Sequence, residues 1–119
     1  MARTPQQIFD HHGAAMDARN LDAIVEDYTD HSVIITAERV YRGRREIRAF
    51  FGALLDALPQ AEWAVPVAIF EGNVLYIEWT VTSREHNVLD GVDTFVFSDG
   101  MIALQTARAS LVKARLNAL

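Results

Sequence analysis

The sequence predicts a single α+β domain in which three N-terminal helices pack against a curved antiparallel sheet. Three observations lead to this fold class: apolar residues recur at helical spacing before Pro59, strand-like alternation occupies the chain after it, and short turns join the strand segments. Half of the 119 residues are hydrophobic, which suffices for one core. Neither a linker nor an internal repeat interrupts the chain, so we expect one domain over residues 1–119.

The first helix is expected to begin at Pro5, because Thr4 can cap it and proline is favoured at the first helical position. Its apolar residues recur at helical spacing: Ile8, Phe9, Ala15 and Met16. His12 lies on the same stripe. A second, short helix follows Asn20, and one of its faces carries Leu21, Ile24, Val25 and Tyr28.

The remaining elements are a small hairpin, a third helix and a meander of long strands. Two β-branched or extended stretches, residues 32–36 and 39–42, predict the hairpin. Apolar residues return to helical spacing over residues 44–58, where Pro59 ends the helix. Four strands joined by short turns are expected after it, over residues 62–70, 74–83, 87–97 and 101–112. This pattern predicts an antiparallel meander.

Composition excludes several kinds of partner. The formal net charge of -5 argues against a nucleic-acid partner, and the chain has neither cysteine nor a run of about 18 apolar residues that would span a membrane. We therefore expect a cytoplasmic protein. No glycine-rich phosphate loop is present, and His11 and His12 would point in different directions on a helix, so we expect no cofactor and no metal.

Three segments together resemble one known group of proteins. They are residues 14–25, residues 41–51 with a Gly-x-x-x-Ile-x-x-Phe pattern, and residues 91–97 followed by an Asp-Gly turn. In this order they resemble the nuclear transport factor 2-like superfamily, and within it the ketosteroid isomerases and SnoaL-like polyketide cyclases. The resemblance implies helices packed in the mouth of a cone-like sheet. Because this superfamily hosts both enzymes and binding domains, function has to be argued from the site.

Asp93 is the first candidate site residue, because it interrupts an otherwise apolar strand. The resemblance matches it to the aspartate that ketosteroid isomerase keeps protonated, so that it donates a hydrogen bond to the substrate oxyanion. Burial in a pocket would raise the pKa of this carboxyl. The alternative is an aspartate that bonds to a neighbouring loop or faces solvent at the sheet edge.

His12 and Tyr28 are the other two catalytic candidates. The resemblance places His12 where the isomerase has its oxyanion-binding tyrosine, and Tyr28 where relatives often have an aromatic residue. We expect both to be hydrogen-bonding partners of Asp93. Plain core roles are the alternatives, because a lone histidine or tyrosine on an apolar face is often a packed core residue.

Five further residues are expected to line the pocket. The resemblance places Thr36 where the isomerase has its catalytic aspartate base, and Phe51 where some relatives have a tyrosine. Threonine cannot act as a general base near neutral pH, so the known steroid isomerase mechanism does not transfer. Strand alternation favours Trp79, Phe95 and Gln105 as wall residues, although tight helix packing would explain Gln105 equally well.

The sequence thus favours a cofactor-free enzyme that performs acid-base chemistry on a small apolar carbonyl or polycyclic compound. A binding module without catalysis and a dimerisation domain are the alternatives. We also expect a homodimer, because apolar residues alternate on both faces of the strands and the helices cover only one face. The residues assigned to the open face are Val92, Val96, Ile102 and Leu104.

Overall fold

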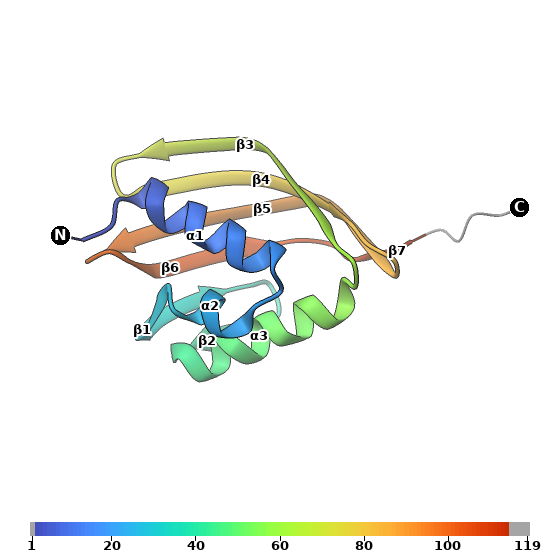
Figure 1. Ribbon diagram of the computed structural model, residues 1–119, viewed down its shortest axis with the longest axis horizontal. Coiled ribbons are helices and arrows are strands. Elements are labelled where there is room, and N and C mark those ends of the chain that lie inside the picture. The colour runs from blue at the N-terminus through green and yellow to red at the C-terminus, as the bar shows by residue number, and fades with distance from the viewer. Residues whose placement is uncertain (1, 115–119) are drawn as a thin grey trace, which may run out of the picture.

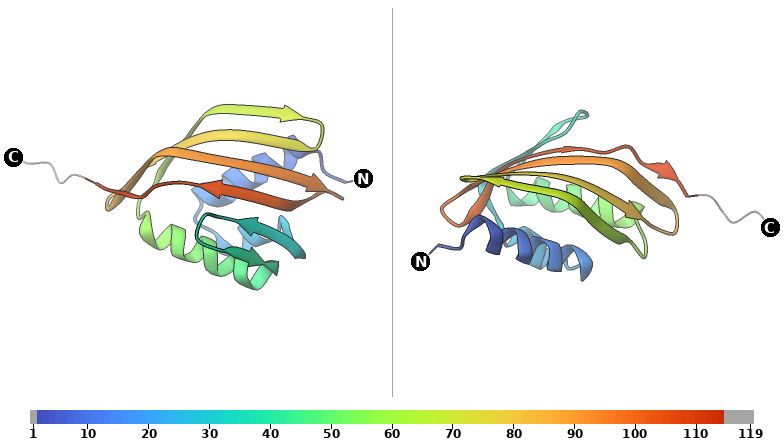
Figure 2. Two further views of the ribbon diagram at one scale, coloured as in Figure 1. Left: turned by 180° about the vertical axis from the view of Figure 1, so that it is seen from behind. Right: turned by 90° about the horizontal axis from the view of Figure 1, so that it is seen from above.

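Three helices lie against the concave face of one curved sheet in the computed structural model, which describes residues 2–114 (Figure 1). The helices are α1 (Pro5–Asp17), α2 (Leu21–Val25) and α3 (Gly43–Ala57). The strands are β1 (Tyr28–Ile35), β2 (Val40–Arg42), β3 (Glu62–Glu71), β4 (Val74–Thr82), β5 (His86–Ser98), β6 (Met101–Arg108) and β7 (Val112–Lys113). The fold is therefore the predicted α+β arrangement, and Figure 2 shows how the long strands bend over the helices.

The sheet is mixed and open. Its strand order is β2-β1-β6-β5-β4-β3, and β7 pairs with β5 outside this path. Strands β3 to β6 form the predicted antiparallel meander, and β1 and β2 form the predicted hairpin. However, β1 runs parallel to β6, so the sheet is not antiparallel throughout. The edge strands β2 and β3 do not pair with each other, and the sheet does not close into a barrel.

Local sequence signals fix the helix starts. The Thr4 side chain accepts a hydrogen bond from the Gln7 backbone and the Gln7 side chain accepts one from the Thr4 backbone, which forms a capping box with Pro5 at the first turn. Asn20 caps α2 by accepting from the Ala23 backbone at 3.1 Å. At the start of α3, Gly43 has φ 78°, and an added Cβ would lie 3.0 Å from the Asp30 carbonyl oxygen.

Two element boundaries differ from the prediction. Tyr28 belongs to β1 and not to the face of α2, because it pairs with Ile102 while the preceding residue, Asp27, accepts the Ile102 backbone N–H at 2.7 Å. The last long strand ends at Arg108. Residues 112 and 113 form a separate strand, β7, against the start of β5. Both boundaries depend on strand pairing with segments that are distant in sequence. The local residue preferences of the chain do not predict such pairing.

The side-chain direction of Ile102 also differs from the prediction. Val96 pairs with Leu104 and Phe97 with Ile102, so Ala103 is an extra residue on β6. Such a bulge shifts the alternation by one residue and turns Ile102 toward the helices, where it is buried. Ile102 is therefore a core residue and not part of the open face.

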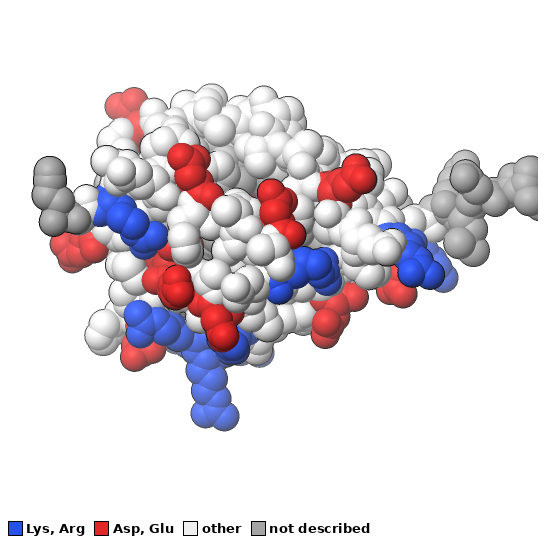
Figure 3. Space-filling view, viewed as in Figure 1, with Lys and Arg blue, Asp and Glu red and all other residues white. Residues whose placement is uncertain are grey.

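The core lies between the helices and the concave face of the sheet. Its fully buried apolar side chains include Ile8, Ile24, Ile47, Leu75, Val81 and Ile102. Acidic and basic side chains lie interspersed over the helix-covered side (Figure 3). Among the described residues, no helix is long and apolar enough to cross a membrane.

Candidate functional site

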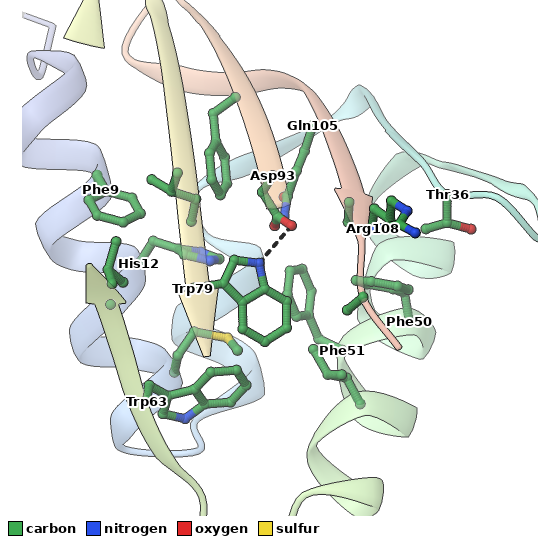
Figure 4. A pocket seen from close by; sticks show the side chains of 18 of the residues that line it. Phe9, His12, Thr36, Phe50, Phe51, Trp63, Trp79, Asp93, Gln105 and Arg108 are labelled. Carbon is green, nitrogen blue, oxygen red and sulfur yellow. Dashed lines mark hydrogen bonds between the residues drawn. The ribbon is translucent and has the colours of Figure 1, made fainter. Parts of the chain in front are cut away.

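A cavity of about 640 Å³ lies between α1, α3 and the concave face of the sheet (Figure 4). Its wall is mostly apolar and includes seven aromatic side chains: Phe9, Tyr41, Phe50, Phe51, Trp63, Trp79 and Phe95. Three buried polar side chains also line it, namely His12, Asp93 and Gln105. The lining residues Asp17, Glu38 and Arg108 are exposed and mark its mouth. A cavity of this size with few polar groups suits a small, mostly apolar ligand.

Asp93 lies on the inner face of β5 with 7% of its surface exposed. Its Oδ1 accepts a hydrogen bond from Trp79 Nε1 at 2.9 Å (Figure 4). Its Oδ2 accepts one from Gln105 Nε2 at 2.9 Å. Burial raises the pKa of Asp93 to about 6, and the two hydrogen bonds oppose this rise because they favour the charged form. The carboxyl can therefore gain or lose a proton close to neutral pH.

The hydrogen-bonding partners of Asp93 are not the predicted ones. Tyr28 donates its O–H to Gln105 Oε1 at 2.5 Å and reaches Asp93 only through the Gln105 amide. The reason is the strand order: Tyr28 is on β1 and Asp93 on β5, and β6 with Gln105 lies between them. The expectation that Tyr28 and His12 bond directly to Asp93 is wrong.

His12 points from α1 into the aromatic part of the cavity. Its ring lies edge-on to Phe51 and Phe95, with centroids 5.7 Å and 5.6 Å away. Its Nδ1 is buried and has no hydrogen-bond partner among the described residues. Burial lowers the pKa of His12 to about 4, and the negative charge of Asp27 offsets only part of the lost solvation. At neutral pH His12 is therefore an uncharged imidazole.

Gly91 positions Trp79, and the sequence-based assignment of site residues missed this role. The two residues are paired across β4 and β5. A Cβ at position 91 would lie 2.4 Å from two carbons of the Trp79 indole, closer than any real contact. The missing side chain thus lets the indole lie across β5 and bring Nε1 to Asp93. A glycine inside a long strand often marks a place where another group packs closely on the backbone. Gly91 within its strand was therefore the sequence feature that could have indicated this role.

The remaining predicted residues also line the cavity, in different ways. Phe51 and Phe95 are almost fully buried wall residues. Thr36 follows the end of β1, and its hydroxyl donates to the Arg39 carbonyl oxygen at 3.0 Å. Helical and strand periodicity did not single out Phe9 and Trp63 as wall residues, because a cavity-lining aromatic and a core aromatic give the same apolar pattern.

Within residues 2–114, no group of three or more histidine, aspartate or glutamate side chains is placed to hold a metal ion. The neighbouring histidines separate as helical geometry requires. His12 faces the cavity, whereas His11 Nδ1 lies 2.8 Å from Asp27 Oδ2, in a cluster that also includes Arg3.

The model of the SnoaL-like domain matches residues 9–105, which is most of the chain. The chain belongs to the SnoaL-like family. No curated protein matches the sequence closely enough to count as a relative. Solved structures match this SnoaL-like domain at low identity. One is a candidate polyketide cyclase from Sinorhizobium meliloti, with 17% identity, a TM-score of 0.76, and coverage of 86% of this chain and 94% of that protein.

Two further structures agree in fold with the SnoaL-like domain. A candidate ketosteroid isomerase from Kribbella flavida is 10% identical, with a TM-score of 0.75 and coverage of 96% of this chain and 83% of that protein. A candidate hydroxylase from Streptomyces galilaeus is 14% identical, with a TM-score of 0.75 and coverage of 89% and 88%. The TM-scores show a shared fold, whereas the identities are too low to transfer an activity. Because the three proteins carry three different activity names on one fold, the chemistry has to be argued from the site.

Proposed function

We propose that this SnoaL-like domain binds a small, largely apolar carbonyl or polycyclic compound and transfers a proton on it without a cofactor, with Asp93 as the acid-base group. The observation that carries the proposal is a buried carboxyl on the wall of an aromatic cavity. The aromatic wall supplies apolar contact area, and the few polar groups fix the orientation of the ligand.

A single carboxyl with a pKa of about 6 suits proton transfer near neutral pH. It can accept a proton from a carbon next to a carbonyl and return that proton at another atom, as an isomerisation or a cyclisation requires. The neutral His12 ring offers the ligand a hydrogen-bonding nitrogen without a charge. Two structural neighbours named as a candidate cyclase and a candidate isomerase are consistent with this chemistry.

Replacing Asp93 with asparagine tests this proposal. Asparagine nearly preserves the shape but cannot exchange a proton, so we expect turnover to fall about 10²-fold or more. The measurement is deuterium exchange at the carbons next to the carbonyl in a panel of bicyclic and polycyclic ketones that includes 2-tetralone, followed by NMR in heavy water. Exchange that the wild type accelerates and Asp93→Asn accelerates equally would remove Asp93 from the chemistry.

Binding without catalysis is the second candidate function. It is favoured by Thr36, which takes the place of the isomerase base and whose hydroxyl already donates to Arg39. Apart from Asp93, the acidic side chains that line the cavity are Asp17 and Glu38, both exposed at the mouth. Ligands that bind to the wild type and are never turned over would favour this function.

We also propose that the outer face of the sheet pairs with a second copy of the chain. Among residues 2–114 no helix covers this face, which carries Val96 and Leu104 together with the more exposed Ile35 and Ile69. Burial of apolar area contributes about 25 cal/mol per Å², and a two-fold pairing needs only one self-complementary surface.

Sedimentation at micromolar concentration is expected to show a dimer, and Val96→Lys with Leu104→Lys should dissociate it by burying unpaired charge. Leu111→Lys is the control, because this exposed leucine lies outside the outer face. A wild-type species of 13.3 kDa would contradict the dimer.

A further inference from the structure

Tyr28, Gln105 and Asp93 form a chain of hydrogen bonds across three neighbouring strands. Tyr28 is fully buried at the start of β1, and its hydroxyl donates to Gln105 Oε1 on β6. Gln105 Nε2 donates in turn to Asp93 Oδ2 on β5. Trp79 Nε1 donates to the other carboxyl oxygen, Oδ1. Both oxygens of Asp93 therefore face N–H donors of the protein.

The two ends of the Gln105 amide are not equivalent, because Oε1 only accepts hydrogen bonds and Nε2 only donates them. Burial raises the pKa of Tyr28 well above its ordinary value, with further contributions from the charges of Asp93 and Asp27, so its hydroxyl keeps its proton. That proton satisfies Oε1, which leaves Nε2 toward Asp93. An amide turned the other way would point Oε1 at the carboxyl and would suit only a protonated Asp93.

In the turned arrangement, Gln105 Nε2 would donate to Tyr28, and the Tyr28 proton would need another acceptor. Within residues 2–114, Gln105 is the one acceptor that the Tyr28 hydroxyl has. A buried hydroxyl without an acceptor loses its hydrogen bonds to water and gains none in return, which is unfavourable. Tyr28 therefore disfavours the turned amide, and with it the protonated form of Asp93.

We propose that Tyr28 is a positioning residue that acts through Gln105: it holds the amide so that an N–H faces Asp93, and thereby keeps the Asp93 carboxyl a proton acceptor toward the cavity. The role of Tyr28 rests on the proposed function in one respect only, namely that Asp93 is the reacting group. It assigns Asp93 the role of base in the first proton transfer, which takes a proton from the ligand onto a carboxyl oxygen.

Other titratable groups around the cavity do not take part in this chain. His12 on α1 and Tyr41 on β2 line the inside, whereas Asp17, Glu38 and Arg108 are exposed at the mouth. Tyr41 is a matched control for Tyr28, because it lines the same cavity but its ring packs on Phe50, with centroids 4.9 Å apart.

The test is a titration of the ligand-free full chain with 13C-labelled aspartate, in which Asp93→Asn assigns the Asp93 signal. We expect Tyr28→Phe to raise the pKa of Asp93 by about one pH unit. Without the Tyr28 hydroxyl, nothing favours the amide orientation in which the Gln105 Nε2 N–H faces the Asp93 carboxylate. Tyr41→Phe should leave the pKa unchanged. Gln105→Met should raise it at least as far as Tyr28→Phe, and this second measurement stands even if Tyr28→Phe does not fold.

The decisive measurement is Tyr28→Phe combined with Gln105→Met. If Tyr28 acts through the amide, the tyrosine substitution adds nothing once Gln105 is methionine. The proposal is overturned if Tyr28→Phe raises the pKa of Asp93 equally with Gln105 and with methionine at position 105. It is also overturned if either single variant leaves the pKa of Asp93 unchanged. Since no ligand is present, this outcome is separate from the ketone exchange assay, whose failure would overturn the proposed function alone.

Discussion

Gly91→Ala is expected to destabilise the fold by about 2 kcal/mol, the usual cost of forcing an extra carbon into a packed site. A Cβ at this position would lie 2.4 Å from Cδ2 and Cε2 of Trp79 and 2.7 Å from Nε1, so the indole must move away from β5. That movement breaks the hydrogen bond from Trp79 to Asp93, and the pKa of Asp93 should rise further as one donor is lost.

Chemical denaturation measures the loss of stability, and Gly52→Ala is the matched control. Gly52 lies within α3, and an added Cβ there would meet only Leu21 Cδ1 at an ordinary 3.8 Å, so alanine should stabilise that helix slightly. Trp79→Phe in the Gly91→Ala background should recover part of the loss, because the smaller ring relieves the overlap. A Gly91→Ala variant as stable as the wild type would mean that glycine is not what admits the indole.

Local signals were sufficient for most of the fold. Thr4 with Pro5 and the long apolar stripe of α3 are short-range patterns, and the structure has both helices where the sequence predicts them. Errors arose where a partner distant in sequence decides the outcome. The bulge at Ala103 reverses the direction of Ile102, and only the pairing with β5 shows it.

The candidate site was predictable as a set of residues but not as a network. Asp93, Gln105 and Trp79 could be placed on inner strand faces by alternation. The strand order decides which of them form hydrogen bonds with one another. No sequence pattern predicts that β6 lies between β1 and β5. For this reason Gln105, expected as a wall residue, proves to be the link between Tyr28 and Asp93.

The second large effect expected is the contribution of Asp93 to the pH dependence of stability. The pKa of its carboxyl is about 6 in the folded chain, against an ordinary value of 3.8. Between these two values the Asp93 carboxyl binds more protons in the folded chain than in the unfolded chain, so its contribution to stability falls as the pH rises through this interval. The difference between the two pKa values corresponds to about 3 kcal/mol once Asp93 is ionised in both states.

Asp93→Asn isolates this contribution, because asparagine does not titrate. Any cost of placing its amide N–H groups opposite Trp79 and Gln105 does not depend on pH, and other groups cancel when the variant is compared with the wild type. The stability of Asp93→Asn relative to the wild type should therefore rise by about 3 kcal/mol from about pH 3 to about pH 7, as measured by denaturation across that range. If the stability difference between Asp93→Asn and the wild type did not change with pH, burial would not penalise the ionisation of Asp93. Proton transfer by Asp93 near neutral pH would then lose its physical basis.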